Sequence, residues 1–147
     1  MSEFSRLQGI AAVNVLCGEL LGEGISRKVF ACKLDPSLVV KVEMPGESDE
    51  YRNFANAYEY RNWHENSDYR PVADWLAPCV SLSPCGLILL QKRVEPLRDS
   101  ELPEKVPDFL TDLKKANFGL YEGRVVCCDY STLITRVSKS LKKADWW

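Results

Sequence analysis

The sequence lacks any apolar run near the ~18 residues that a membrane-spanning helix needs, so we expect no transmembrane segment. It also lacks a basic N-terminal segment followed by an unbroken apolar one, which is the pattern of a signal peptide. Internal repeats and low-complexity tracts are missing too. These absences predict a single globular domain in the cytoplasm, with no membrane partner.

The sequence has no excess of positive charge. Lys and Arg number 19, Asp and Glu number 21, and the formal net charge is −2. Proteins that bind nucleic acid usually carry a basic surface, so this balance argues against a nucleic-acid partner. With 147 residues, 46% of them hydrophobic and 27% charged, the chain can form one domain with a hydrophobic core.

The six cysteines have no pair at the two-residue spacing of a zinc knuckle. Cys79 and Cys85 have five residues between them, and Cys127 and Cys128 are adjacent. The even count permits disulfides, but most cysteines lie in β-like apolar runs. We therefore favour free, buried thiols in a reducing compartment over disulfide bonds.

The pattern of apolar residues predicts an α+β fold with an antiparallel sheet packed against one long helix. Within that helix, Tyr51, Phe54 and Tyr58 recur at helical spacing, as do Glu59 and Trp63, and these residues are expected to point inward. The expected elements are three strands at 15–24, 28–34 and 38–44, a helix capped by Ser48 or Asp49 that runs to about 66, a short helix at 72–77, two strands within 78–94, an irregular linker at 95–107, a hairpin within 118–130 turning at Glu122–Gly123, and a final amphipathic helix within 131–147.

Two features of the first half point to phosphate chemistry. Gly22 and Gly24 join two expected strands, where glycines let backbone N–H groups approach phosphate oxygens; a plain hairpin turn is the other reading. Lys41 lies in an apolar strand, where an unpaired buried ammonium is costly. Its side chain either points to solvent or faces a cleft, where Glu59 on the helix would pair with it.

Three polar residues near the end of the chain are candidates for a metal site. Asp112 and Asn117 are five residues apart, and Asp129 ends the last expected strand. Carboxylate and amide oxygens are the hard ligands that Mg²⁺ takes together with substrate phosphates. Each residue also has a structural explanation: a helix cap, a turn residue and a strand end.

The order of these pieces resembles the protein-kinase-like superfamily over about residues 15–131. "LVVKVE" is similar to the Val-Ala-Ile-Lys strand, and "DLKKAN" is similar to the catalytic-loop pattern Asp-Leu-Lys-x-x-Asn. "CCDYS" stands where Asp-Phe-Gly would be. The resemblance implies a kinase-like N-lobe at 1–94, with a five-stranded antiparallel sheet and one long helix. A truncated C-lobe at 95–147 would carry the catalytic loop and hairpin.

The resemblance also implies a role for each matching residue, with ATP and Mg²⁺ as cofactors. Backbone groups near 91–94 would border the adenine. The implied sets are Gly22, Gly24, Lys41 and Lys114 for nucleotide binding, Lys41, Glu59 and Asp112 for catalysis, with Asp112 orienting or deprotonating the acceptor hydroxyl, and Asn117 and Asp129 for Mg²⁺.

The sequence departs from the kinase pattern at several points. Arg27 replaces the third glycine of the phosphate loop, where it could form a salt bridge to a phosphate. Leu110–Thr111 replaces the His-Arg pair, and Asp129 is followed by Tyr130–Ser131 without the glycine, which argues against a flipping segment. Few residues follow Asp129, so we expect the peptide-binding platform to be missing or supplied by a partner.

Two hypotheses therefore remain open. The chain is either a minimal Ser/Thr-kinase-like phosphotransferase acting on a protein or small-molecule hydroxyl, or a pseudokinase-like protein that binds and inhibits or bridges a partner protein. Trp146 and Trp147 end the sequence, and exposed indoles are costly in water. They either fold back over the core or anchor a partner protein or a second copy of the chain.

Overall fold

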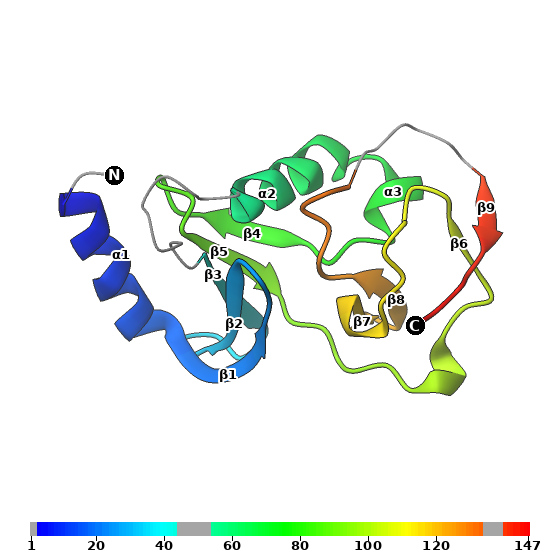
Figure 1. The fold of residues 1–147 in the computed structure, drawn as a ribbon, viewed down its shortest axis with the longest axis horizontal. Coiled ribbons are helices and arrows are strands. Elements are labelled where there is room, and N and C mark those ends of the chain that lie inside the picture. The colour runs from blue at the N-terminus through cyan, green and yellow to red at the C-terminus, as the bar shows by residue number, and fades with distance from the viewer. Residues whose placement is uncertain (1–2, 44–53, 134–139) are drawn as a thin grey trace.

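The structure is a computed structural model that describes residues 3–43, 54–133 and 140–147 (Figure 1). Single 3-10 turns occur at Asp99–Glu101 and Lys115–Asn117. The helices and strands, in chain order, are α1 (Glu3–Leu16), β1 (Cys17–Glu23), β2 (Arg27–Cys32), β3 (Leu38–Glu43), α2 (Ala55–Asn66), α3 (Arg70–Ala73), β4 (Cys79–Leu82), β5 (Ile88–Lys92), β6 (Lys105–Pro107), β7 (Phe118–Tyr121), β8 (Arg124–Cys127) and β9 (Leu141–Lys143).

Five strands form one antiparallel sheet in the order β1-β2-β3-β5-β4. Strand β3 lies at its centre, where Lys41 is the register partner of Val29 on β2 and Leu89 on β5. Helix α2 packs across β3, β4 and β5. The predicted α+β class, with a five-stranded antiparallel sheet, is confirmed.

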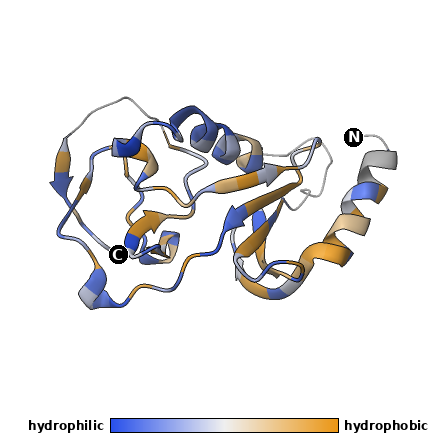
Figure 2. Cartoon of the chain, turned by 180° about the vertical axis from the view of Figure 1, so that it is seen from behind, coloured by the Kyte–Doolittle hydropathy of each residue, from blue (hydrophilic) through white to orange (hydrophobic). Residues whose placement is uncertain are grey.

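The buried face of α2 is mostly polar. The predicted inward position is confirmed for Glu59 and for Trp63, which packs partly buried against the main core, and is wrong for Phe54 and Tyr58. Phe54 and Tyr58 are 49% and 44% exposed, and the left-handed backbone of Phe54 (φ 52°) keeps it out of the helix. The expected caps and Tyr51 lie outside the described residues. Figure 2 shows α2 as largely hydrophilic. The residues buried on α2 are Ala55, Asn56, Glu59, Asn62 and Asn66.

Helix α1 was not predicted from the sequence. Its residues Ala12, Val13 and Leu16 pack against a small core cluster under the sheet, and α1 lies at one end of the molecule (Figure 1). The expected short helix at 72–77 is displaced, because α3 covers Arg70–Ala73 and shares only two residues with it. None of the helices within the described ranges is both long and apolar enough to cross a bilayer.

The described residues after β5 form two small two-stranded sheets, β6-β9 and β7-β8. β7 and β8 make the predicted hairpin, and both turn residues, Glu122 (φ 49°) and Gly123 (φ 76°), have the positive φ that a tight two-residue hairpin requires. Gly119 on β7 lies so close to the backbone at Val94 and Glu95 that a Cβ would approach a Val94 side-chain carbon to 2.4 Å. Only glycine allows this close passage.

The final helix expected within 131–147 is wrong over its last residues. Leu141–Lys143 forms β9, which pairs with β6 through Pro107 and its neighbours, and residues 134–139 lie outside the described part of the chain. The local amphipathic pattern loses to pairing with an open strand edge, because strand pairing satisfies the backbone groups of both segments.

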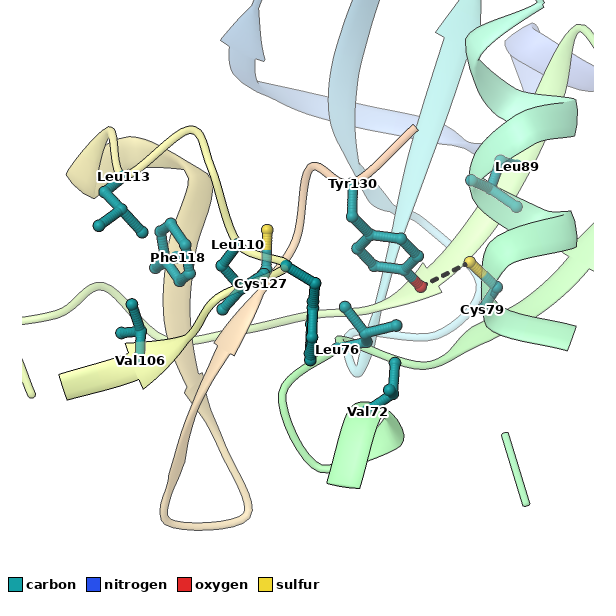
Figure 3. Close-up of a cluster of buried hydrophobic side chains, with 11 residues drawn as sticks. Val72, Leu76, Cys79, Leu89, Val106, Leu110, Leu113, Phe118, Cys127 and Tyr130 are labelled. Atoms are coloured by element: carbon teal, nitrogen blue, oxygen red, sulfur yellow. Dashed lines mark hydrogen bonds between the residues drawn. The ribbon is translucent and has the colours of Figure 1, made fainter. Parts of the chain in front are cut away.

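The main core joins the two halves of the chain (Figure 3). Trp146 covers its edge, meeting Phe118 edge-on with ring centroids 4.9 Å apart and donating a 2.9 Å hydrogen bond to the Pro103 carbonyl. Trp146 therefore folds back over the core. The six cysteines all carry thiols rather than disulfide bonds. The cluster is built from Val72, Leu76, Cys79, Leu89, Val106, Phe109, Leu110, Leu113, Phe118, Cys127 and Tyr130.

Candidate functional site

Lys41 is buried and paired rather than exposed. Its side chain is 4% exposed, and Nζ lies 2.7 Å from Glu59 Oε2 on α2. The same ammonium donates a hydrogen bond to the backbone carbonyl of Cys128. The expected Lys41–Glu59 ion pair is thus present, and it extends to the segment that follows β8.

Glu59 lies at the centre of a cluster of charged side chains, which also contains Lys41, Arg27 and Asp129. Its fully buried carboxylate accepts hydrogen bonds from Lys41, from both terminal nitrogens of Arg27 (2.8 and 3.4 Å), and from the Tyr130 backbone N–H (2.7 Å). Burial alone would raise the pKa of Glu59, but the charges of Lys41 and Arg27 outweigh it and hold that pKa below its ordinary value. Glu59 therefore stays ionised inside the protein.

Arg27 joins this cluster, which the sequence did not indicate. It is the first residue of β2 and is 7% exposed. Its Nη2 lies 2.9 Å from Asp129 Oδ1, and its Nη1 also donates to Asn56 Oδ1 at 3.3 Å. Burial opposes its charge, yet Glu59 and Asp129 raise the pKa of Arg27 above its ordinary value. Its partners here are carboxylates, and contact with a phosphate stays a prediction.

The segment after β8 is held in place by side-chain hydrogen bonds from Asn62 on α2 and from its own Tyr130 hydroxyl. Asn62 donates side-chain hydrogen bonds to the carbonyls of Tyr130 (2.9 Å) and Ser131 (3.4 Å). The Tyr130 hydroxyl donates to the Ala77 carbonyl at 2.6 Å and lies 3.2 Å from Cys79 Sγ (Figure 3). The Asp129 side chain, by contrast, is 52% exposed. The polar sequence of α2 gave no signal that Asn62 would hold this segment.

The expected catalytic loop is compact. Asn117 Nδ2 donates to Asp112 Oδ2 at 3.1 Å, and the Asn117 carbonyl accepts the Cys128 N–H at 2.7 Å, which places Asn117 beside the segment that carries Asp129. Asp112 is exposed. The ammonium of Lys114 lies over the Trp147 ring, 5.8 Å from its centroid. The proposed role of Lys114 in nucleotide binding stays a prediction.

Gly22 and Gly24 lie in the β1–β2 hairpin, and the stretch at 91–94 that was expected to border adenine lies at the end of β5. Gly22 pairs with Val29, and the Gly24 N–H donates to the Arg27 carbonyl at 2.8 Å, so this stretch closes the β1–β2 hairpin. In the stretch expected to meet adenine, the N–H groups of Lys92 and Arg93 already donate to backbone carbonyls. Neither N–H is free to meet a base in this structure.

The oxygen atoms of Asn117 and Asp129 are of the kind that Mg²⁺ prefers. No three His, Cys, Asp or Glu side chains converge as a metal site within the described ranges. The expected ligands are oxygens of Asn117 and Asp129. The Asn117 amide nitrogen is committed to Asp112, which leaves its amide oxygen for a cation, and the half-exposed Asp129 carboxylate uses one oxygen for Arg27. Two hard oxygens shared with phosphate and water suit Mg²⁺.

The fold and the site define a small α+β protein with a buried cluster of ion pairs between its sheet and α2. No protein-family model matches the sequence, and no curated protein matches it. The resemblance to protein kinases stays a prediction from the sequence.

Proposed function

We propose that this protein binds ATP with Mg²⁺ and transfers a phosphoryl group to a hydroxyl of a protein or small molecule, as a minimal member of the protein-kinase-like superfamily. The observation that carries the proposal is that Lys41, Glu59 and Asp129 belong to one connected set of ion pairs. They come from β3, from α2 and from the segment after β8. Residues that match the kinase pattern in sequence order therefore lie close together in space, and this supports the proposal.

The chemistry of each group suits phosphoryl transfer. The Lys41 ammonium has two acceptors in the described structure, Glu59 and the Cys128 carbonyl, which leaves one hydrogen for a phosphate oxygen. Asn117 and Asp129 would hold Mg²⁺, which when bound neutralises charge on the phosphate oxygens. Asp112 would accept a proton from an incoming hydroxyl, and its exposure beside Asn117 supports this role.

The division into lobes belongs to this proposal. Residues 1–94 would form the N-lobe, whose sheet and α2 present Lys41 and Glu59. Residues 95–147 would form a reduced C-lobe, whose hairpin delivers Asp129. The contact between Asn62 and the Tyr130 carbonyl supports this arrangement, because it fixes the segment carrying the acid against the N-lobe helix.

A second candidate function is a pseudokinase-like protein that binds a partner. The observation favouring it is that the Lys41 and Arg27 side chains are closed to solvent, at 4% and 8% exposure. Protein atoms thus cover most of both side chains, which limits the approach of a phosphate. In the second reading the cluster only stabilises the fold, and the function lies on the protein surface.

Thermal unfolding with and without ligand distinguishes these functions. We expect ATP with Mg²⁺ to raise the unfolding temperature of the wild type, since a ligand at 100 times its Kd stabilises by about 2.7 kcal/mol. The added effect of Mg²⁺ should disappear in Asp129→Asn and persist in the control Lys28→Met, which alters a half-exposed cation on β2. No shift of the wild type at millimolar ATP, with or without Mg²⁺, would support the binding protein instead.

A further inference from the structure

Four charged side chains alternate in sign across the interior of the protein. Lys41 contacts Glu59, Glu59 contacts Arg27, and Arg27 contacts Asp129, at 2.7, 2.8 and 2.9 Å. In this series Arg27 is the link between the sheet and the acid that follows β8. The contact joins positions 102 residues apart in the sequence.

The planar guanidinium of Arg27 has a fixed orientation. Glu59 accepts hydrogen bonds from both terminal nitrogens of Arg27, and Asn56 Oδ1 accepts one from Nη1. Asn56 is itself fixed, because its Nδ2 donates to the backbone carbonyls of Lys41, Gly86 and Leu87. A fork held on one side in this way offers Nη2 to Asp129 from a defined direction.

The fixed fork determines how Asp129 is presented. Nη2 takes Oδ1 at 2.9 Å, while the side chain as a whole remains 52% exposed. The negative charge of the fully buried Glu59 is shared between Arg27 and Lys41, so Arg27 keeps positive charge for Asp129. The Asp129 carboxylate thus stays accessible, and its hydrogen bond to Arg27 fixes its orientation.

We propose that Arg27 is a positioning residue for a divalent cation: by holding Oδ1 of Asp129, it orients the other carboxylate oxygen as the cation ligand. The inference deepens the proposed function and rests on it for the identity of the cation as the partner of a nucleotide. Hydrogen-bond partners of ligating carboxylates typically change metal affinity by about 10- to 100-fold when they are removed. Lysine cannot replace Arg27, because one ammonium cannot reproduce the two-nitrogen fork.

Mn²⁺ titration without nucleotide, followed by water-proton relaxation, tests this role. The variants are Arg27→Met, Arg27→Lys, Asp129→Asn and the control Lys28→Met. We expect Asp129→Asn to abolish the site, both Arg27 variants to weaken Mn²⁺ binding by about 10- to 100-fold, and the control to match the wild type. Circular dichroism verifies the fold, and Arg27→Lys keeps the buried positive charge if Arg27→Met does not fold.

The opposite result has a clear meaning. If Arg27 merely competes with the cation for Asp129, both Arg27 variants will bind Mn²⁺ as tightly as the wild type or more tightly, and the inference is overturned. It is also overturned if Asp129→Asn binds Mn²⁺ like the wild type. ATP binding measured without metal judges the proposed function separately, so the Arg27 role can fail while ATP binds, or hold while ATP does not.

Discussion

The side chain of Asn62 donates a 2.9 Å hydrogen bond to the backbone carbonyl of Tyr130, 68 positions further along the chain. Asn62 is 6% exposed and lies on the buried polar face of α2. Through this contact the helix holds the backbone next to Asp129. The position of Asp129 therefore depends on Asn62, a neutral residue whose side chain donates to backbone carbonyls.

Replacing Asn62 with alanine should destabilise the protein. The Tyr130 carbonyl would lose its side-chain donor and keep only the Leu133 N–H. Loss of one such hydrogen bond typically costs about 0.5–1.5 kcal/mol. Urea unfolding followed by circular dichroism measures the loss. The matched control is Glu65→Ala on the same helix, where the side chain is 61% exposed, and it should change stability by less than about 0.5 kcal/mol. Equal losses of stability in both variants would contradict the role of Asn62 in holding this segment.

Replacing Glu59 with glutamine should make the stability difference from wild type depend on pH. At pH 7 the variant leaves Lys41 and Arg27 without their buried carboxylate, and breaking a buried pair costs about 3–5 kcal/mol. Because the folded pKa of Glu59 lies below its ordinary value of 4.5, the carboxylate stabilises fully above that value. The contribution is lost as the pH falls below 4.5 and through the folded pKa.

Urea unfolding of wild type and Glu59→Gln from pH 7 to pH 3 checks this dependence. The difference in unfolding free energy should be constant above about pH 5 and shrink below the ordinary carboxyl pKa. The control is Glu65→Gln, which alters a 61% exposed carboxylate near the end of α2. It should show little effect at any pH, and a wild-type advantage that grows on acidification would reverse the assigned sign.

Replacing Asp112 with asparagine should separate binding from chemistry. The side chain is exposed and contacts Asn117 through Oδ2, so the substitution leaves the Lys41–Glu59 pair intact. We expect phosphate transfer from labelled ATP to fall by about 10²-fold or more, in line with the loss of a general base, while the ATP-induced thermal shift is retained. Transfer at the wild-type rate would remove Asp112 from the proposed mechanism.

The two terminal tryptophans should differ in their contribution to stability. Trp146 packs edge-on against Phe118 and donates to the Pro103 carbonyl, so Trp146→Ala should cost about 3 kcal/mol. Trp147 is 67% exposed and contacts Lys114, so Trp147→Ala should cost less than about 1 kcal/mol. Urea unfolding followed by circular dichroism compares them. Self-association through Trp147 would appear as a smaller sedimentation coefficient in Trp147→Ala than in the wild type.

Local patterns in the sequence predicted the sheet because strand alternation is a short-range signal. The runs that contain β2 and β3 were located in this way, and the cost of an unpaired ammonium pointed from Lys41 to Glu59. The same reasoning failed for α2, since it searches for apolar stripes. Asn56 is buried because it bonds to backbone carbonyls of β3 and of Gly86 and Leu87, which no local pattern announces.

The role of Arg27 was beyond local reasoning for a related physical reason. Its nearest acid in the cluster, Glu59, lies 32 positions away, and Asp129 lies 102 positions away. Only the folded chain brings them together. The end of the chain was misjudged because Leu141–Lys143 satisfies its backbone by pairing with β6, and this long-range contact outweighs the helical tendency of its own residues.

Main-chain hydrogen bonds also join the described parts of residues 3–95 and 105–147, which are the two halves on either side of the connection at 96–104. Cys127 exchanges hydrogen bonds with Trp75 and Ala77, and Glu95 exchanges a reciprocal pair with Leu120. A hinge rotation about the connection at 96–104 would break these contacts, so we expect the two parts to move together. A protease cut within that connection should therefore leave two fragments that stay associated and copurify.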